Sequence, residues 1–303
     1  MESARCVLKA GEGCVEVWAG YQIQFAGMRR FTWQDEVVSE LKTALTTVTL
    51  GAGEVLSGVY ASTEGARCDA ENRLFTNPGA STFPSDTAAI RWERGTVVPP
   101  PPQPLAGEGG VHYYRYSPGS GFRVWQPDQT LARWSGVVRR LAHDGSARPM
   151  WLALREALLV GAVGVLHPPI GESTRFGLRI AVRAPARGPK SAPAVSEALV
   201  DGALCALHAG APASAAAAVA AALAPKLPGV DPGRLIDLVT DRQAVLPGSP
   251  FKLSAAGSVQ LSPSDEFCDA GEVSIVRDPS AAVIETRGEV FTLTRSASTS
   301  VRG

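Results

Sequence analysis

Cationic side chains precede two predicted helices, and these two loops carry the clearest chemical signal in the sequence. The residues concerned are Arg29, Arg30 and Thr32 in the first loop, and Arg187, Lys190 and Ser191 in the second. Each hydroxyl side chain stands where the cap of a helix is expected. The free N–H groups of a first helical turn, the helix dipole and nearby cations can together bind a phosphate or a carboxylate. Neither a Walker loop nor a GxGxxG pattern accompanies them, so solvated helix ends with exposed arginines are the alternative.

Aromatic and arginine side chains are interleaved in the segment HYYRYSPGSGFRVW, residues 112–125. Two short strands, 111–116 and 122–125, are predicted around its Pro-Gly turn, as in a hairpin. Because strand side chains alternate, Tyr114 and Tyr116 would share a face. Such a surface can stack nucleic-acid bases or sugars, whereas the same aromatic pairs could instead stabilise a sheet and cover its core. The candidate stacking residues are Tyr114, Arg115, Tyr116 and Trp125.

Acidic residues gather in two turn segments, one around Asp69 and Glu71 and one from Asp265 to Asp269. Their carboxylates could combine into one site across the fold, although acidic turns explain them more simply. The four histidines stand far apart without HxH or HExxH spacing, so no metal site and no cofactor are predicted. The sequence contains neither a GxSxG elbow nor a convincing Cys–His pair. No catalytic residue is therefore assigned, and whether the protein is an enzyme stays open.

Charge and composition narrow the class of protein. The 303 residues carry 29 basic and 29 acidic side chains, so no overall field draws the chain to nucleic acid or to an anionic membrane. The five cysteines are scattered without a CxxC pair, which argues against a disulfide framework. No apolar leader opens the chain, and the most apolar run, 157–170, is too short to span a bilayer. We expect a cytoplasmic protein without membrane contact, and the arginine- and alanine-rich composition suggests a GC-rich bacterial genome.

The apolar periodicity predicts a mixture of short strands and helices. Strands are expected at 14–18, 21–25, 55–60, 73–76, 88–93, 176–183, 258–261, 272–277, 281–285 and 289–294. Helices are expected at about 32–48, 147–163, 194–208, 213–224 and 234–240. This order predicts an α+β protein in which mostly antiparallel sheets have helices packed on one face.

One proline-rich segment is predicted to divide the chain. Residues 97–110, VVPPPPQPLAGEGG, favour polyproline II followed by flexible glycines, which is typical of a linker. We therefore expect a first lobe at 1–96, a second, elaborated lobe at 111–295, and a flexible tail at 296–303. A protease is expected to cut first near 105–110.

The two expected lobes resemble diverged copies of one unit. A shift of 157 residues gives nine identities over the 34 positions from 20 to 53, and it would make Val38 and Val195 equivalent core residues. Two further similarities follow in the same order, between Cys68–Ala70 and Cys268–Ala270 and between Ala88–Gly95 and Ala281–Gly288. Similar supersecondary units of biased composition are the alternative explanation. The prediction is an internal duplication that gives two pseudo-symmetric lobes.

Three classes of function are compatible with these observations. A non-catalytic binding or assembly protein is favoured, with a protein partner or self-association, because the architecture is duplicated and no catalytic constellation is recognisable. The first alternative is an enzyme that acts on a phosphorylated or anionic small molecule at the cationic loops. The second is a nucleic-acid-binding protein, which zero net charge argues against. A pocket lined by Arg187, Lys190 and a carboxylate would favour the enzyme, and a flat apolar surface would favour assembly.

Overall fold

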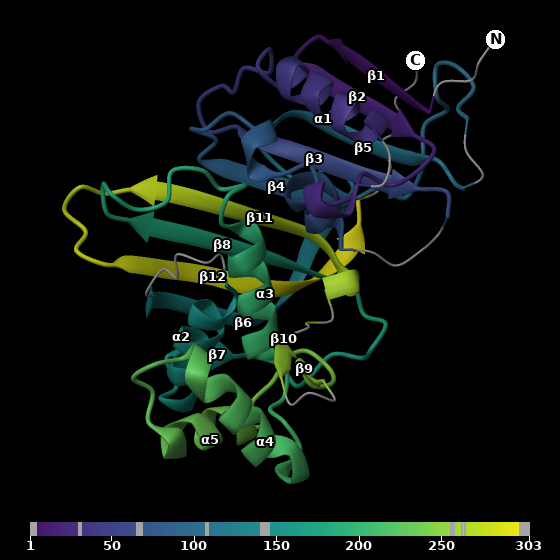
Figure 1. Cartoon of the computed structure of the whole chain (residues 1–303). Helices are drawn as coiled ribbons and strands as arrows, with labels where there is room; N and C mark the ends of the chain where they lie inside the picture. The colour runs from purple at the N-terminus through teal and green to yellow at the C-terminus, as the bar shows by residue number, and fades with distance from the viewer. Residues whose placement is uncertain are drawn as a thin grey trace.

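Ten strands form one continuous sheet in the computed structural model of the chain (Figure 1). The structure describes residues 5–29, 32–64, 69–106, 109–139, 146–254, 258–261, 263 and 265–296. In order across the sheet, the strands are β1 (Cys6–Gly11), β2 (Cys14–Ala19), β5 (His112–Gly119), β3 (Val55–Ser62), β4 (Ala89–Arg94), β11 (Cys268–Arg277), β8 (Phe176–Ala184), β12 (Ile284–Arg295), β6 (Trp125–Arg139) and β7 (Val163–Val165). A separate two-stranded sheet joins β9 (Phe251–Leu253) to β10 (Val259–Leu261).

The series of parallel and antiparallel pairings across the large sheet reads the same from both edges. β3 and β4 are parallel, as are β8 and β11, and the other neighbouring strands are antiparallel. The order of these pairings is therefore palindromic about the junction between β4 and β11. At this junction Arg91 lies opposite Glu272. The expected α+β class with a mostly antiparallel sheet is confirmed, and the two halves belong to a single sheet.

Three helices lie on one face of this sheet (Figure 1). The helices are α1 (Thr32–Leu45), α2 (Arg148–Leu159), α3 (Ser196–Leu207), α4 (Ala213–Leu223) and α5 (Pro232–Thr240). α1 packs on β1 and β2, α2 on β6, and α3 on β8, while α4 and α5 pack on each other. In α1, Val37, Leu41 and Leu45 recur every four residues and are buried, which makes one apolar stripe. No helix in the described part of the chain is long and apolar enough to cross a membrane.

The core lies between the helices and the sheet, and one glycine brings two helices close together. A Cβ at Gly202 of α3 would lie 2.4 Å from the carbonyl oxygen of Ala147 and 2.6 Å from Cβ of Met150. Glycine therefore allows α3 and α2 to pack at backbone distance. Below them, Leu178 and Ile180 of β8 are fully buried.

Most predicted helices and strands are present. The differences concern the strands: which segments form one, and which strands pair. The five helices form within a few residues of their expected positions, and Oγ of Ser146 accepts a hydrogen bond from the backbone of Arg148 where α2 begins. Residues 21–25 are not a strand, and 72–76 form a short helical turn instead of the expected strand. The predicted strands at 281–285 and 289–294 belong to one strand, β12. The predicted hairpin is wrong, because β5 pairs with β2 and β3 whereas β6 pairs with β12 and β7.

The proline-rich segment packs on the sheet, on the face opposite the helices. Nε1 of Trp18 donates a hydrogen bond to the carbonyl oxygen of Pro99 (3.0 Å). Trp18 and Tyr113 also form a small second core with Val98 and Leu105. β5 follows this segment and pairs with β3, which precedes it. The segment therefore connects strands within one half of the sheet, and the sheet continues past the boundary that was expected there.

The 157-residue register does not match this arrangement. Under that register residues 20–25 would correspond to β8, but they form no strand. α1 precedes β3 along the chain, whereas α3 follows β8. Val38 lies inside α1, Val195 lies just before α3, and both are only half-buried. The predicted equivalence of these two valines in a core is wrong.

Candidate functional site

The face of the sheet opposite the helices, here called the reverse face, is polar over β11, β8, β12 and β6. Along β8, Leu178 and Ile180 are buried toward the helices, and Arg179 and Arg183 alternate with them. A strand with a period of two places these arginines on the other face. The register of β12 sets Glu289 beside Arg179. This part of the sheet therefore presents charged side chains that no helix covers.

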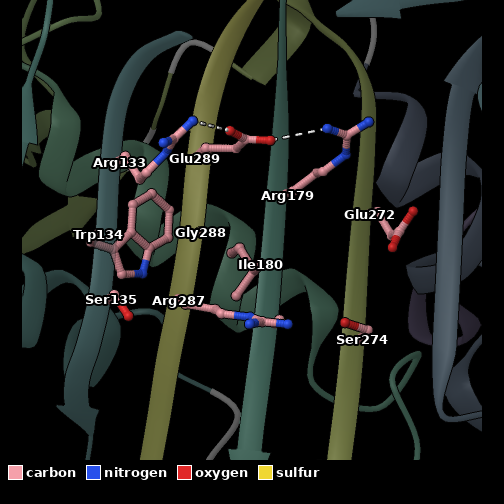
Figure 2. Close-up of a pocket in the computed structure, with 11 residues that line it drawn as sticks. Arg133, Trp134, Ser135, Arg179, Ile180, Glu272, Ser274, Arg287, Gly288 and Glu289 are labelled. Carbon is pink, nitrogen blue, oxygen red and sulfur yellow. Dashed lines mark hydrogen bonds and ion pairs between the residues drawn. The ribbon is translucent and has the colours of Figure 1, made fainter.

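Five charged side chains cross the reverse face in one row, here called the charged row: Arg91, Glu272, Arg179, Glu289 and Arg133. Nη2 of Arg91 lies 2.6 Å from a carboxylate oxygen of Glu272. Glu289 contacts both Arg179, at 3.0 Å, and Arg133, at 3.4 Å (Figure 2). The ring of Phe122 lies 5.3 Å from the guanidinium of Arg91 and 5.2 Å from that of Arg179. Arg91 is buried, whereas the side chains of Arg179 and Arg133 are 40% and 65% exposed. Because exposed ion pairs contribute only about 0–1 kcal/mol, the Glu289 end of the row defines a polar surface more than it stabilises the fold.

Small side chains beside the charged row leave a shallow depression, here called the trough. Ser274 of β11, Ala181 of β8 and Ser135 of β6 line it. Two adjoining cavities, of about 400 Å³ and about 340 Å³, share Ser135, Ala181 and Arg287 as lining residues. The trough therefore runs across several strands, with the charged row along one side.

The far wall of the trough is acidic. Arg183 places one guanidinium nitrogen 2.6 Å from Asp278 and another 3.3 Å from Glu285. Hydrogen bonds from Ser280 and Arg183 lower the pKa of Asp278 to about 2, so this carboxylate is ionised at neutral pH. The charged row has three arginines and two glutamates, whereas the far wall has one arginine and two carboxylates. The two walls thus carry opposite net charge.

Arg287 is the side chain in the trough that is available to a ligand. It extends from β12 across β8 toward β11, where Ser274 lies (Figure 2). Its guanidinium is exposed and forms no hydrogen bond or ion pair with any residue that the structure describes. Arginine presents five N–H donors in a planar fork that matches a carboxylate or phosphate. With the hydroxyls of Ser135 and Ser274 nearby, Arg287 can bind an anionic group at the middle of the trough.

In the first predicted cationic loop, the donors of Arg29 are already used by the fold. The guanidinium of Arg29 is largely buried and donates hydrogen bonds to the carbonyl oxygens of Gln24, Asn77 and Pro78, at 3.0 to 3.1 Å. It also contacts Asp35 at 2.7 Å. Its donors are thus used to hold the loop before α1 against the turn at Asn77. Thr32 is the exposed first residue of α1, and Arg30 lies outside the described residues.

The second predicted cationic loop is separated from its helix. α3 begins at Ser196, with Val195 before it, so the predicted cap at Ser191 is wrong. Arg187 and Lys190 are exposed in the loop that leads to this helix. Four residues therefore lie between Ser191 and the first residue of α3, and the free N–H groups of the helix do not follow directly after the cations.

The predicted stacking surface is also wrong, because its aromatic rings are inside the protein. Tyr114 and Tyr116 are fully buried. The hydroxyl of Tyr114 accepts a hydrogen bond from the backbone N–H of Ile23 (2.8 Å), and that of Tyr116 donates to the carbonyl of Leu74 (2.7 Å). Tyr114 packs against Tyr60, and Tyr116 packs against Phe75 and Phe83. The rings therefore fill the core, which is the alternative that cross-strand aromatic pairs allowed.

The other two residues of that predicted surface are also held by the fold. Trp125 is only 3% exposed, and its Nε1 donates to the carbonyl oxygen of Arg94 (2.8 Å). Arg115 is half-buried, and its Nε lies 3.2 Å from the sulfur of Cys14. Neither side chain presents a flat surface on which a base could stack.

Carboxylates from both turn segments do meet, together with one that the sequence did not single out. Oxygens of Asp69, Asp201 and Asp265 lie within 4.8 Å of one another. Burial, then the neighbouring acids, raises the pKa of Asp201 to about 8, and burial raises that of Glu71 to about 7. Ser196 and Thr76 donate hydrogen bonds to Glu71. Asp201 and Glu71 are therefore partly protonated near neutral pH, which limits the repulsion among the clustered carboxylates.

Asp201 was missed because it lies in the middle of α3, where an acid usually faces solvent. The trough was missed for a different reason. The sequence does contain the polar residues of the trough, spaced so that each set lies on one face of a strand. They are Arg179 and Arg183 in one strand and Glu285, Arg287 and Glu289 in another. Only the register between β8 and β12 places those residues side by side. No protein-family model, curated protein or solved structure matches the chain, so the site is interpreted from its geometry.

Proposed function

We propose that this chain is a non-catalytic binding protein whose protein partner lies in the trough and presents a carboxylate side chain to Arg287. The observation that carries the proposal is an exposed arginine without an ion-pair partner among the described residues, placed between two walls of fixed charge. The charged row and the far wall would set the orientation of an extended segment, because their net charges differ in sign. Electrostatic complementarity of this kind mainly gives specificity and a fast association rate.

The residues of the trough support binding over catalysis. Among the residues that the structure describes, the lining includes no cysteine and no histidine, and its four carboxylates, Glu272, Glu289, Glu285 and Asp278, pair with arginines. Among the described lining residues, no histidine stands beside Ser135 or Ser274 to activate it, and the nearby carboxylates Glu272 and Glu289 are already paired with arginines. The nucleic-acid alternative also loses its support, because Tyr114 and Tyr116 are buried.

We also propose that the two halves of the sheet derive from one duplicated unit, in a register set by topology. The palindromic strand order supports pairing β3 with β8, β4 with β11, and β5 with β12. In this pairing, the uncovered part of the reverse face corresponds to the part that the proline-rich segment covers in the first half. Covering one copy and leaving the other open would restrict binding to the second half.

Selection from a displayed random peptide library tests the proposed function. Peptides that bind the wild type are expected to contain Asp or Glu at a fixed position, and to bind Arg287→Glu about tenfold or more weakly, or ~1.4 kcal/mol. Arg277→Glu is the matched control, because Arg277 is exposed at the end of β11 and outside the trough. The proposal fails if the selected peptides lack a common acid, or if both variants bind them as the wild type does.

A further inference from the structure

A second pocket, separate from the trough, lies where the carboxyl ends of two parallel strands meet three other segments. Tyr60 and Ser62 come from the end of β3, and Arg94 from the end of β4. Arg175 precedes β8, and Arg295 ends β12. The cavity has a volume of about 180 Å³. Its lining consists of Tyr60, Ser62, Arg94, Gly95, Thr96, Trp125, Arg175 and Arg295, and we call it the arginine pocket.

Within the described part of the chain, the lining of the arginine pocket has three guanidinium groups and no carboxylate. One acid lies behind it, since Asp269 is 1% exposed and contacts both Arg175 and, at 3.6 Å, Arg94. Arg295 differs from these two. Arg295 is exposed, and its guanidinium lies over the ring of Trp125. The pocket is therefore electropositive, and a strong N–H donor at its rim remains available.

The cations of the pocket are held in place by an aromatic ring. The guanidinium groups of Arg175 and Arg295 lie 5.5 Å and 6.0 Å from the ring centroid of Trp125, as in cation–π contacts. Trp125 is fixed in turn, because its Nε1 donates to the carbonyl of Arg94 and its backbone N–H donates to Glu93 (3.1 Å). Donors that are already oriented lose little freedom when a ligand binds, and this favours affinity.

We infer that the arginine pocket binds the phosphate group of a small molecule. Guanidinium groups pair with phosphate oxygens through two parallel hydrogen bonds, and three of them suit a dianion better than a single carboxylate. The hydroxyls of Ser62 and Thr96 line the same cavity and can donate to the remaining oxygens, whereas the buried hydroxyl of Tyr60 is hydrogen-bonded to Nδ1 of His112 (2.8 Å). A water occupies roughly 30 Å³ in the liquid, so a cavity of about 180 Å³ accommodates a phosphate group while the rest of a larger ligand extends outward. This inference does not depend on the trough.

Calorimetric titration with inorganic phosphate tests this inference, with phenyl phosphate and acetate as further probes. The wild type is expected to bind phosphate, and Arg295→Gln to bind it about tenfold or more weakly. Arg277→Gln, which removes an exposed arginine elsewhere, should bind as the wild type does. Tighter binding of phenyl phosphate would identify a phosphate monoester as the source, and equal binding would identify inorganic phosphate.

Arg295→Lys keeps the charge at the rim but loses the planar fork, so an intermediate affinity is expected from it. Circular dichroism would verify that each variant is folded. If Arg295→Gln does not fold, Arg295→Lys serves as the test. No phosphate binding by the wild type would overturn the inference. So would acetate binding as tightly as phosphate, or equal phosphate affinity in the wild type and both variants at position 295.

Discussion

At the scale of single residues, the described arginines include some that are enclosed by the fold and others whose guanidinium groups are exposed. Arg29 and Arg155 are enclosed, since Arg155 is 1% exposed and donates to the carbonyl oxygens of Leu238, Ala206 and Gln243. Arg287 and Arg295 are exposed. The sequence alone does not separate the two kinds, because enclosure depends on carbonyl groups far away along the chain.

Arg29→Ala should destabilise the protein by about 2–4 kcal/mol. The substitution leaves three carbonyl oxygens without their charged donor, and hydrogen bonds to charged groups contribute roughly 1.5–3 kcal/mol. Arg187→Ala, in the exposed loop, should change the free energy of unfolding by less than about 0.5 kcal/mol. Urea denaturation monitored by circular dichroism measures both values, and equal effects of the two substitutions would refute this assignment.

The crowded carboxylates predict that stability falls as the pH rises toward 8. Asp201 binds its proton more tightly in the folded protein, where its pKa is about 8, than in the unfolded chain. The folded state therefore binds more protons between about pH 4 and pH 8, and its free energy of unfolding decreases across that window. Asp201→Asn should flatten this decrease and stabilise the protein at pH 8 by on the order of 1–3 kcal/mol. Parallel pH profiles for the wild type and the variant would contradict the prediction.

At the scale of elements, local patterns were sufficient for the helices and insufficient for the sheet. The period of α1, with Val37, Leu41 and Leu45 on one stripe, is contained in a single segment, so its position could be predicted. The partner of β5 could not, because β5 joins β2 and β3 instead of the neighbouring strand β6. The trough is a consequence of such pairings, and the polar alternation in β8 and β12 becomes a site only once their register is known.

The contact between α2 and α3 makes a sharp prediction at this scale. Gly202→Ala should destabilise the protein by about 1–3 kcal/mol, since the added methyl group would meet the backbone of Ala147 and overpacking costs of that order are typical. Gly121→Ala is the control, because a Cβ there meets nothing within 4 Å. Thermal denaturation of the two variants distinguishes them. A wild-type melting temperature for Gly202→Ala would mean that the two helices can separate at little cost.

At the scale of the whole molecule, one sheet carries a closed half and an open half. The proline-rich segment covers the reverse face at Trp18 and Tyr113. Phe122 covers the middle of the sheet, over Arg91 and Arg179. Beyond it, the trough is exposed over β11, β8, β12 and β6 (Figure 2). The helices and the core thus lie on one side of the sheet, and the proposed binding surface lies on the other.

A double-mutant cycle between Arg287 and the acid of a selected peptide tests this account most directly. Calorimetry would compare the wild type and Arg287→Glu, each against the acidic peptide and against a peptide in which arginine replaces the acid. The account predicts a coupling energy of about 1–3 kcal/mol, with the charge-reversed pair restoring much of the affinity that either single change removes. A coupling energy near zero, with each change acting independently, would show that the carboxylate does not meet Arg287 and would contradict binding in the trough.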